Sequence, residues 1–179
     1  KELALISDEV FADYPAAPDA TRIPSLAGNP EVLTFALGGL SKMLGLPQMK
    51  LSWISVSGPE TAKREALEKL EMIADTYLSV NTPVQNALPR WLAGREAMQR
   101  LLRERVEKNR QSLCARDWKT IGCEVLSSEG GWNAILRVPS VHTEEEWALR
   151  LLETQGVLVH PGYFFDFEAE AYLVLSLLP

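Results

Sequence analysis

The chain has 179 residues, of which 46% are apolar and 23% are charged. These proportions are close to those of average globular proteins, which excludes an intrinsically disordered chain. Acidic residues outnumber basic ones by 24 to 18, and the resulting net charge of −6 argues against a nucleic-acid-binding protein, since such proteins usually carry a basic face.

The cysteines and histidines form no metal-site pattern. Cys114 and Cys123 are nine residues apart, and His142 and His160 lie too far along the chain to complete a site, so we expect no metal. Two cysteines of this kind are typical of reduced thiols in a cytoplasmic protein. No apolar run reaches the roughly 18 residues that span a bilayer, so no membrane segment is expected.

Three short apolar segments predict strands in the first sixty residues: 3–7 (LALIS), 32–37 (VLTFAL) and 51–56 (LSWISV). The first is continuously apolar, as in a fully buried parallel strand, and it ends at the acidic pair Asp8-Glu9. A proline-rich connection over residues 13–30 separates it from the second strand. Strands separated by long connections predict one flank of an α/β sheet.

The apolar period changes to a helical one from Glu60, with Pro59 expected at the first helical position and Ser57 or Gly58 as its cap. A short helix is expected over residues 84–91, interrupted at Pro89. A long amphipathic helix, rich in arginine and glutamate, is expected over residues 94–113.

The rest of the chain predicts a smaller, mixed α+β unit. Its expected strands cover residues 123–128, 133–138, 157–160 and 172–178. Between them Thr143 and the three glutamates that follow are typical of a capped helix start, and Gly156 marks its end. We place the boundary near residue 100, giving domains of residues 1–100 and 101–179. Because the chain starts at a lysine and enters a buried-type strand at once, we expect it to be a piece of a longer protein.

The densest chemical signal combines Asp8 at one strand end with Lys42, which follows the next strand and the pair Gly38-Gly39. Open α/β sheets bind ligands at the carboxyl ends of their strands. A lysine flanked by small residues there can lose its solvation and become a nucleophile towards carbonyls. On spacing alone, a solvated lysine in a glycine-rich loop is the simpler interpretation.

Five segments in register resemble the C-terminal half of class I/II aminotransferases, the fold-type I enzymes that use pyridoxal phosphate. They are Asp8-Glu9-Val10-Phe11 (Asp-Glu-x-Tyr in the family), Gly39-Leu40-Ser41-Lys42 (Ser-x-Ser-Lys), Pro47 to Ser52 (Pro-Gly-x-Arg-x-Gly), Glu129 to Trp132 (a Gly-Gly-aromatic hairpin), and Gly156-Val157 with Pro161 to Phe164 (Gly-Val…Pro-Gly-x-x-Phe). The resemblance implies part of the large cofactor-binding domain, followed by the small C-terminal domain.

The resemblance also implies roles for single residues. Lys42 would form a Schiff base with pyridoxal phosphate and carry the proton between substrate and cofactor. Asp8 would pair with the pyridine nitrogen and keep it protonated, so that the ring can accept electrons. Ser41 and Lys50 would hold the phosphate. Gly38 and Gly39 would let the backbone approach the cofactor, although a tight turn explains these glycines equally well.

Three cofactor positions depart from the family pattern. Phe11 replaces a tyrosine whose hydroxyl donates to the cofactor's phenolate oxygen, so we expect the Schiff base to hold its proton more tightly. Gly39 replaces a phosphate-binding serine. Lys50 replaces an arginine, which exchanges a two-pronged donor for a point charge. The last two changes predict weaker or differently shared phosphate binding.

Val174 stands where the family has the arginine that binds the substrate α-carboxylate. A valine cannot pair with a carboxylate, so another residue supplies the charge, the substrate lacks a carboxylate there, or the activity has changed. Arg137 on the neighbouring hairpin strand is a candidate substitute, although a surface-facing arginine is the simpler interpretation. Trp132 and His160 are weaker candidates for substrate contact.

The sequence therefore predicts a transaminase, present as a C-terminal fragment that is inactive alone, and a homodimer acting on amino acids and 2-oxo acids. Two alternatives stay open. One is a pyridoxal-phosphate lyase or decarboxylase of the same fold, which the missing arginine favours. The other is a cofactor-sensing domain of a transcription regulator, which binds the cofactor without turnover and would carry a winged helix upstream.

Overall fold

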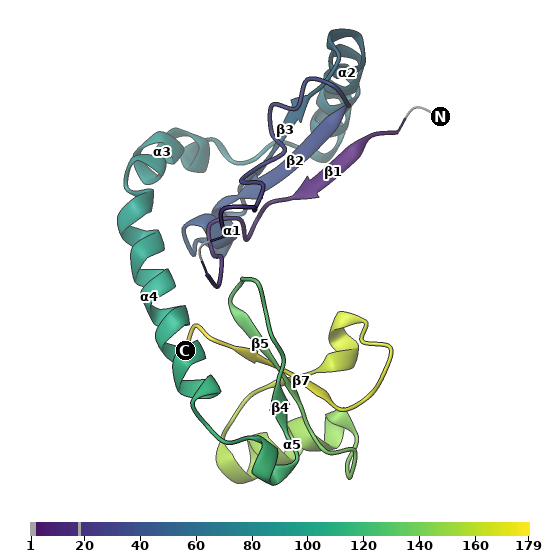
Figure 1. Ribbon diagram of the computed structural model, residues 1–179. Coiled ribbons are helices and arrows are strands. Elements are labelled where there is room, and N and C mark those ends of the chain that lie inside the picture. Colours follow the sequence, from purple (N-terminus) through teal and green to yellow (C-terminus); the bar gives the residue numbers. More distant parts are fainter. Residues whose placement is uncertain (1–2, 18) are drawn as a thin grey trace. The chain divides into compact units, whose positions relative to one another are not determined.

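The computed structural model describes residues 3–17 and 19–179, and the chain divides into two compact units. Unit 1 extends to Leu101 and unit 2 begins at Leu102, so the division falls within helix α4 (Arg95–Cys114). The boundary expected from the sequence, near residue 100, lies in the same helix. Figure 1 shows the order of the elements along the chain.

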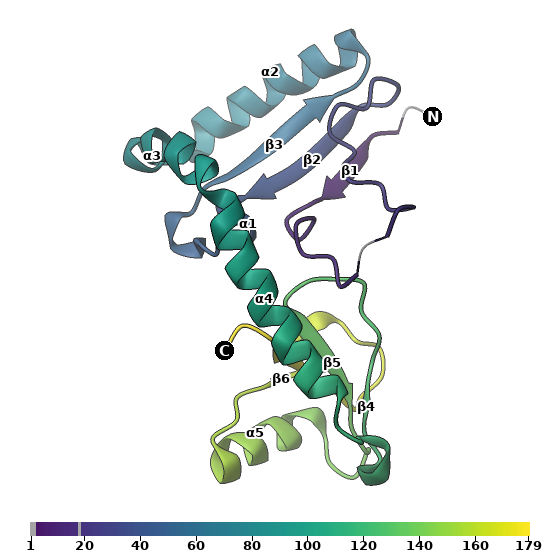
Figure 2. The same ribbon diagram turned by 60° about the vertical axis from the view of Figure 1, so that its left-hand side comes forward.

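Unit 1 contains a three-stranded sheet in the order β1 (Leu5–Asp8), β2 (Thr34–Gly39), β3 (Ser52–Ser57). β1 is parallel to β2, with Asp8 opposite Leu37, and β3 is antiparallel to β2. Figure 2 shows the three strands side by side, with helix α2 (Glu60–Tyr77) running along them. The predicted strands are therefore present, and the first is parallel to its neighbour.

The predicted burial of β1 is wrong. Leu5 is exposed and Ile6 keeps 74% of its surface open to solvent. β1 is an edge strand, and among the described residues no strand pairs with its outer edge. Its apolar composition is typical of a central strand, but its surroundings here are those of an edge.

The helices of unit 1 begin and end close to the expected positions, with two corrections. Pro59 is the cap of α2 and not its first residue. Helix α3 (Thr82–Ala93) is not interrupted at Pro89 but runs through it, starting from an Asn81 side chain that accepts a hydrogen bond from the Val84 amide. A proline removes one hydrogen bond from a helix, and the apolar face of α3 compensates by packing into the core.

The core of unit 1 surrounds the short helix α1 (Leu40–Met43) and the 3₁₀ helix η1 (Pro47–Met49). Leu40, Leu44 and Leu51 are buried there against Val84 of α3. Leu40 is one of the few fully buried large side chains. The segment that carries Lys42 is therefore fixed by apolar packing on its inner side.

Unit 2 holds an antiparallel sheet in the order β4 (Glu124–Val125), β5 (Asn133–Arg137), β7 (Tyr172–Ser176), β6 (His160–Pro161). Helix α5 (Glu144–Gln155) packs on one face through Trp147, Ala148 and Leu151, over a core that includes Leu136 and Leu173. The 3₁₀ helices η2 (Lys119–Ile121) and η3 (Gly162–Phe165) complete the unit.

The predicted start and end of α5 are confirmed. The Thr143 hydroxyl accepts from the Glu146 amide, and the Glu146 carboxylate accepts from the Thr143 amide. Gly156 ends the helix in the left-handed conformation, with φ of 65°.

Two expected strands of unit 2 are much shorter than the sequence indicates. Residues 123–128 give only Glu124–Val125, and residues 157–160 contribute only His160 to β6. The Cys123 amide donates to the Trp118 carbonyl, and the Val157 amide donates to the Leu151 carbonyl at the end of α5. Turn and cap hydrogen bonds therefore occupy the amides of Cys123 and Val157, which lie outside the observed strands.

Candidate active site

Asp8 and Lys42 come from the same edge of the sheet in unit 1. Asp8 is the last residue of β1, and β2 runs directly from Gly39 into α1, whose third residue is Lys42. Because β1 and β2 are parallel, their carboxyl ends lie at one edge. The topology therefore gives this edge the carboxylate and the amine that the sequence singled out.

The side chain of Lys42 is partly buried and faces an aromatic ring. Its Nζ lies 5.7 Å from the centroid of Phe11, which stands in the turn after β1. This distance is within the range of a cation–π contact. The phenylalanine that replaces the family's tyrosine thus lies beside the proposed nucleophile.

The backbone of Lys42 is held by the same turn segment. The Tyr14 hydroxyl donates to the Lys42 carbonyl at 2.9 Å and lies 3.3 Å from the Met43 carbonyl. Tyr14 is only 2% exposed. No sequence pattern points to this residue, since it lies in a proline-rich connection and hydrogen-bonds to backbone atoms.

The carboxylate of Asp8 is exposed, and its Oδ1 accepts a hydrogen bond from the Val10 amide at 3.1 Å. This Asx turn fixes the carboxylate at the strand end. The other oxygen has no hydrogen bond among those found within the described residues, so Asp8 keeps acceptor capacity.

Glu9, next to Asp8, has a structural role that sequence reasoning missed. Burial alone would raise the pKa of its carboxyl, but hydrogen bonds from the Ser25 hydroxyl, the Leu26 amide and the Ser7 hydroxyl outweigh this effect and lower the pKa. Through these hydrogen bonds Glu9 links the end of β1 to Ser25 and Leu26 in the connection between β1 and β2. Adjacent acids look alike in the sequence, and only the structure separates their roles.

The glycines before Lys42 are explained by packing. A Cβ on Gly38 would lie 2.5 Å from the Trp53 Nε1, on the opposite residue of β3. A Cβ on Gly39 would lie 3.2 Å from the Leu51 carbonyl oxygen. Gly39 has φ of −179°, which is extended backbone, so neither a tight turn nor an unusual conformation is needed to account for it.

Ser41 and Lys50 lie at either end of the segment around η1. Ser41 is the second residue of α1 and is partly exposed. Lys50 is exposed and adopts the left-handed conformation, with φ of 51°, at the end of η1. The structure thus keeps both side chains within unit 1 and accessible to solvent.

Three of the four candidates in unit 2, Val174, Arg137 and His160, lie on its sheet, and Trp132 comes directly before β5. Val174 is 4% exposed and pairs with Ile135 on one side and His160 on the other. Arg137 lies two residues beyond Ile135, so the period of the strand places it on the same face as Val174. The Arg137 guanidinium forms an ion pair with Glu124.

Trp132 is buried, and its carbonyl accepts from the Leu177 amide, which gives it a place in the packing of unit 2. His160 is exposed, with the rings of Phe164 and Phe165 centred 6.1 and 6.3 Å away. These contacts bring His160 next to an exposed aromatic pair on η3.

Across residues 3–17 and 19–179, no three His, Cys, Asp or Glu side chains come together in a way that would hold a metal ion. In the same ranges no helix is both long and apolar enough to cross a bilayer.

Comparisons with known proteins agree with the resemblance found in the sequence. The family model described as aminotransferase class I and II matches residues 1–175. An alanine aminotransferase of Mycobacterium tuberculosis (strain ATCC 25618 / H37Rv) is 26% identical over 184 residues, covering 99% of this chain and 43% of the relative. The glutamate-pyruvate aminotransferase AlaA of Escherichia coli K12 is 23% identical, covering 99% of this chain and 45% of the relative.

Solved structures give the same result for the fold. An aminotransferase from Escherichia coli matches with a TM-score of 0.78 and 23% identity, covering 99% of this chain and 45% of that one. An alanine aminotransferase from Pyrococcus furiosus matches with a TM-score of 0.79 and 21% identity, with the same coverage. The fold is therefore part of the fold-type I aminotransferase fold, as predicted, and the chain spans less than half the length of these relatives.

Proposed function

The chain belongs to the aminotransferase class I and II family, and we propose that it is the C-terminal half of a transaminase that uses pyridoxal phosphate. The reaction would exchange an amino group between an amino acid and a 2-oxo acid. The observation that carries this proposal is the placement of Asp8 and Lys42 at one edge of the sheet, at the ends of parallel strands.

The residues at this edge fit pyridoxal phosphate by their chemistry. Lys42 offers an amine for the aldehyde, Asp8 offers a carboxylate with remaining acceptor capacity, and Ser41 and Lys50 offer a hydroxyl and a cation for the phosphate. When bound, the cofactor supplies an electron sink for the bonds at the substrate Cα.

The remaining steps fall to this chain's own side chains. The Asp8 carboxylate would accept a hydrogen bond from the pyridine nitrogen and so hold a proton there. Lys42, once displaced by the amino substrate, would take the proton from the substrate Cα. It would then deliver that proton to C4′, the cofactor carbon that carried the aldehyde. Phe11 would limit water at the Lys42 amine, since its ring already lies against Nζ.

Alanine and glutamate are the amino donors that we propose, with pyruvate and 2-oxoglutarate as acceptors. Support comes from the relatives named alanine aminotransferase and glutamate-pyruvate aminotransferase. All of these substrates carry an α-carboxylate, which Val174 cannot bind. Arg137 is the cation of unit 2 that shares its sheet face with Val174, and we propose it as the carboxylate ligand, released from Glu124.

The test uses the full-length protein. It is mixed with pyridoxal phosphate, reduced with borohydride and digested, and the labelled peptide is mapped. We expect label confined to Lys42, loss of label in Lys42→Arg, and normal label in the matched control Lys69→Arg, which changes an exposed lysine on α2. An unlabelled Lys42 in the wild-type protein would contradict the proposal.

A lyase or decarboxylase is the second candidate, favoured by the buried valine at position 174. Amino-acid substrates incubated with the full-length protein loaded with pyridoxal phosphate, without borohydride, separate the two. Amino transfer to pyruvate or 2-oxoglutarate supports the transaminase, whereas release of ammonia or carbon dioxide without transfer supports the alternative. Binding of the cofactor without either product would indicate a sensing domain.

We also propose a homodimer in the cytoplasm. The family resemblance supports the dimer, and the free thiols Cys114 and Cys123 support a reducing compartment. Light scattering coupled to size-exclusion chromatography of the full-length protein measures the first, and fractionation of the cells measures the second. A monomer, or a protein recovered from an oxidising compartment, would contradict the respective proposal.

A further inference from the structure

Tyr14 is a buried tyrosine in a connection whose other described residues are exposed or partly exposed. Its neighbours Pro15 and Ala17 are exposed, whereas its own side chain is 2% exposed. A buried phenol almost always donates its hydroxyl proton to a defined partner, because an unsatisfied hydroxyl is costly inside a protein. The identity of that partner therefore indicates what the residue is for.

The partner of Tyr14 is the backbone of the α1 helix at the proposed nucleophile. The hydroxyl lies 2.9 Å from the Lys42 carbonyl and 3.3 Å from the Met43 carbonyl, across 28 and 29 residues of chain. A hydroxyl has a single proton, so the shorter contact is the main hydrogen bond and the second shares it. The last carbonyls of a helix point beyond its own amides, and Tyr14 supplies a donor at that end.

The other end of this link is the strand that carries Asp8. The segment between them is a series of turns in which the Val10 amide donates to the Asp8 carboxylate and the Tyr14 amide donates to the Phe11 carbonyl at 2.9 Å. Leu40, fully buried, fixes the start of α1 from the opposite side. The segment from Asp8 to Tyr14 thus contacts Lys42 at its Nζ through Phe11 and at its carbonyl through Tyr14.

We propose that Tyr14 is a positioning residue for Lys42, holding the backbone of the nucleophile in register with the strand end that carries Asp8. It would act through the hydrogen bond to the Lys42 carbonyl. The inference rests on the proposed function, since it assigns Lys42 the role of the reacting amine.

The test compares Tyr14→Phe with the matched control Tyr77→Phe in the full-length protein. Tyr14→Phe removes only the hydroxyl and keeps the ring in the core, while Tyr77 is 80% exposed at the end of α2. The cofactor-free proteins are mixed with pyridoxal phosphate, and borohydride trapping over time gives the rate at which Lys42 is labelled. Steady-state kinetics of the loaded proteins then give kcat and KM.

We expect Tyr14→Phe to slow labelling of Lys42 by about tenfold and to lower kcat by a similar factor with KM unchanged, because a small displacement of a reacting group costs one to two orders of magnitude. Tyr77→Phe should leave both rates within a factor of two. A purely structural tyrosine would lower the melting temperature but leave the labelling rate of the folded protein unchanged, and that result would overturn the inference.

Tyr14→Met serves as a second variant if Tyr14→Phe folds poorly, since its flexible apolar side chain fills the same space and supplies no donor. Wild-type labelling and kcat in either folded variant would overturn the role of Tyr14 while leaving the proposed function intact. Failure to label Lys42 in the wild-type protein would overturn the proposed function itself, and the inference with it.

Discussion

The two units of the chain bury their sheets very differently. In unit 2, Leu173 in the central strand β7 is 1% exposed and lies in a core that α5 covers. In unit 1, β1 carries exposed Leu5 and Ile6, and the exposed side chains of Ile54 on β3 and Leu67 on α2 line an open apolar pocket. Unit 2 therefore has a core of its own, while the sheet that carries the chemistry exposes the side chains that a larger sheet would bury.

The comparison predicts that truncating an apolar side chain lowers the free energy of unfolding in the core of unit 2 but not at β1. Leu173→Ala should destabilise unit 2 by about 2–5 kcal/mol, because it removes buried volume from a packed core. Ile6→Ala should change stability by less than about 0.5 kcal/mol in the isolated chain, since its side chain is already hydrated. Urea unfolding followed by circular dichroism measures both.

Measuring Leu173→Ala and Ile6→Ala in the full-length protein extends this comparison. There, a cost of several kcal/mol for Ile6→Ala would show that residues outside this chain cover β1. Equal costs for the two variants in the isolated chain would contradict the difference between the units.

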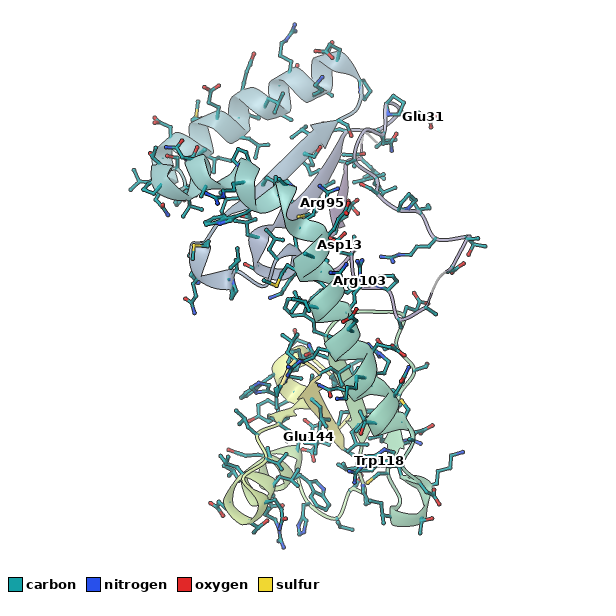
Figure 3. All side chains as sticks on the ribbon, turned by 90° about the vertical axis from the view of Figure 1, so that its left-hand side faces the viewer. Asp13, Glu31, Arg95, Arg103, Trp118 and Glu144 are labelled. Atoms are coloured by element: carbon teal, nitrogen blue, oxygen red, sulfur yellow. The ribbon has the colours of Figure 1, made fainter. Side chains whose placement is uncertain are left out.

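The next largest effect on stability is expected at a buried carboxylate. Glu144, labelled in Figure 3, lies in the first turn of α5 and is 3% exposed. Its two oxygens accept from the amides of Tyr163 and Tyr172, at 2.8 and 2.7 Å, which ties η3 and β7 to the helix. Glu144→Gln replaces one acceptor by a donor and should cost about 1–3 kcal/mol.

The matched control is Glu145→Gln, the next residue of the same turn, whose side chain is exposed and should tolerate the change within about 0.5 kcal/mol. Thermal unfolding of both variants measures the difference. Similar melting temperatures would mean that the two hydrogen bonds add nothing to stability.

In unit 1 the sharpest variant is Phe11→Tyr, which restores the hydroxyl found in the family. The phenol would donate to the cofactor's phenolate oxygen and withdraw negative charge, so the nitrogen that joins Lys42 to the cofactor would lose its proton at lower pH. We expect the pH midpoint of the visible band to fall by on the order of one unit in the full-length protein. Phe35→Tyr, on β2, is the control, and an unchanged midpoint in Phe11→Tyr would contradict the assignment.

The smallest expected effect concerns Glu9. Its pKa is lowered in the folded protein, after the hydrogen bonds from Ser25, Leu26 and Ser7 outweigh burial. The stabilisation is therefore present above the unfolded pKa of 4.5 and is lost as the pH falls through the lower folded value. Because the site is near the surface, we expect this stabilisation to be roughly a few tenths of a kcal/mol.

Glu9→Gln should remove this dependence, so that wild type and variant differ at pH 7 and converge as the pH falls below the folded pKa of Glu9. Urea unfolding at several pH values measures the difference. A constant gap across this range would show that the charge of Glu9 is not what holds the connection.

Local chemistry explains why much of the fold was predictable. The Thr143 cap, the glutamates after it and Gly156 act within one helix, so neighbouring residues contain all the information. The burial of β1 and the shortness of the strands near 123 and 157 depend on partners far away in the chain or on competing turn hydrogen bonds. Sequence spacing contains no record of those partners.

The residues of the candidate site also differ in whether the sequence could predict them. Asp8 and Lys42 could be predicted to share an edge, because parallel strands bring their carboxyl ends together whatever the side chains are. Tyr14 could not be predicted, since its hydroxyl meets backbone carbonyls 28 residues away and any tyrosine in a loop looks the same. The roles of Arg137, His160, Ser41 and Lys50 stay predictions.

The indole of Trp53, on β3, fills the space next to Gly38. Gly38 lies on β2, the strand that leads to Lys42. This packing gives unit 1 its own fluorophore at the sheet edge, separate from Trp118, Trp132 and Trp147 in unit 2. With Trp91 replaced by phenylalanine, the emission lost on Trp53→Phe isolates the signal of that edge. The emission wavelength and the quenching of Trp53 fluorescence then report on how the sheet edge beside Lys42 folds, in solution and without any substrate.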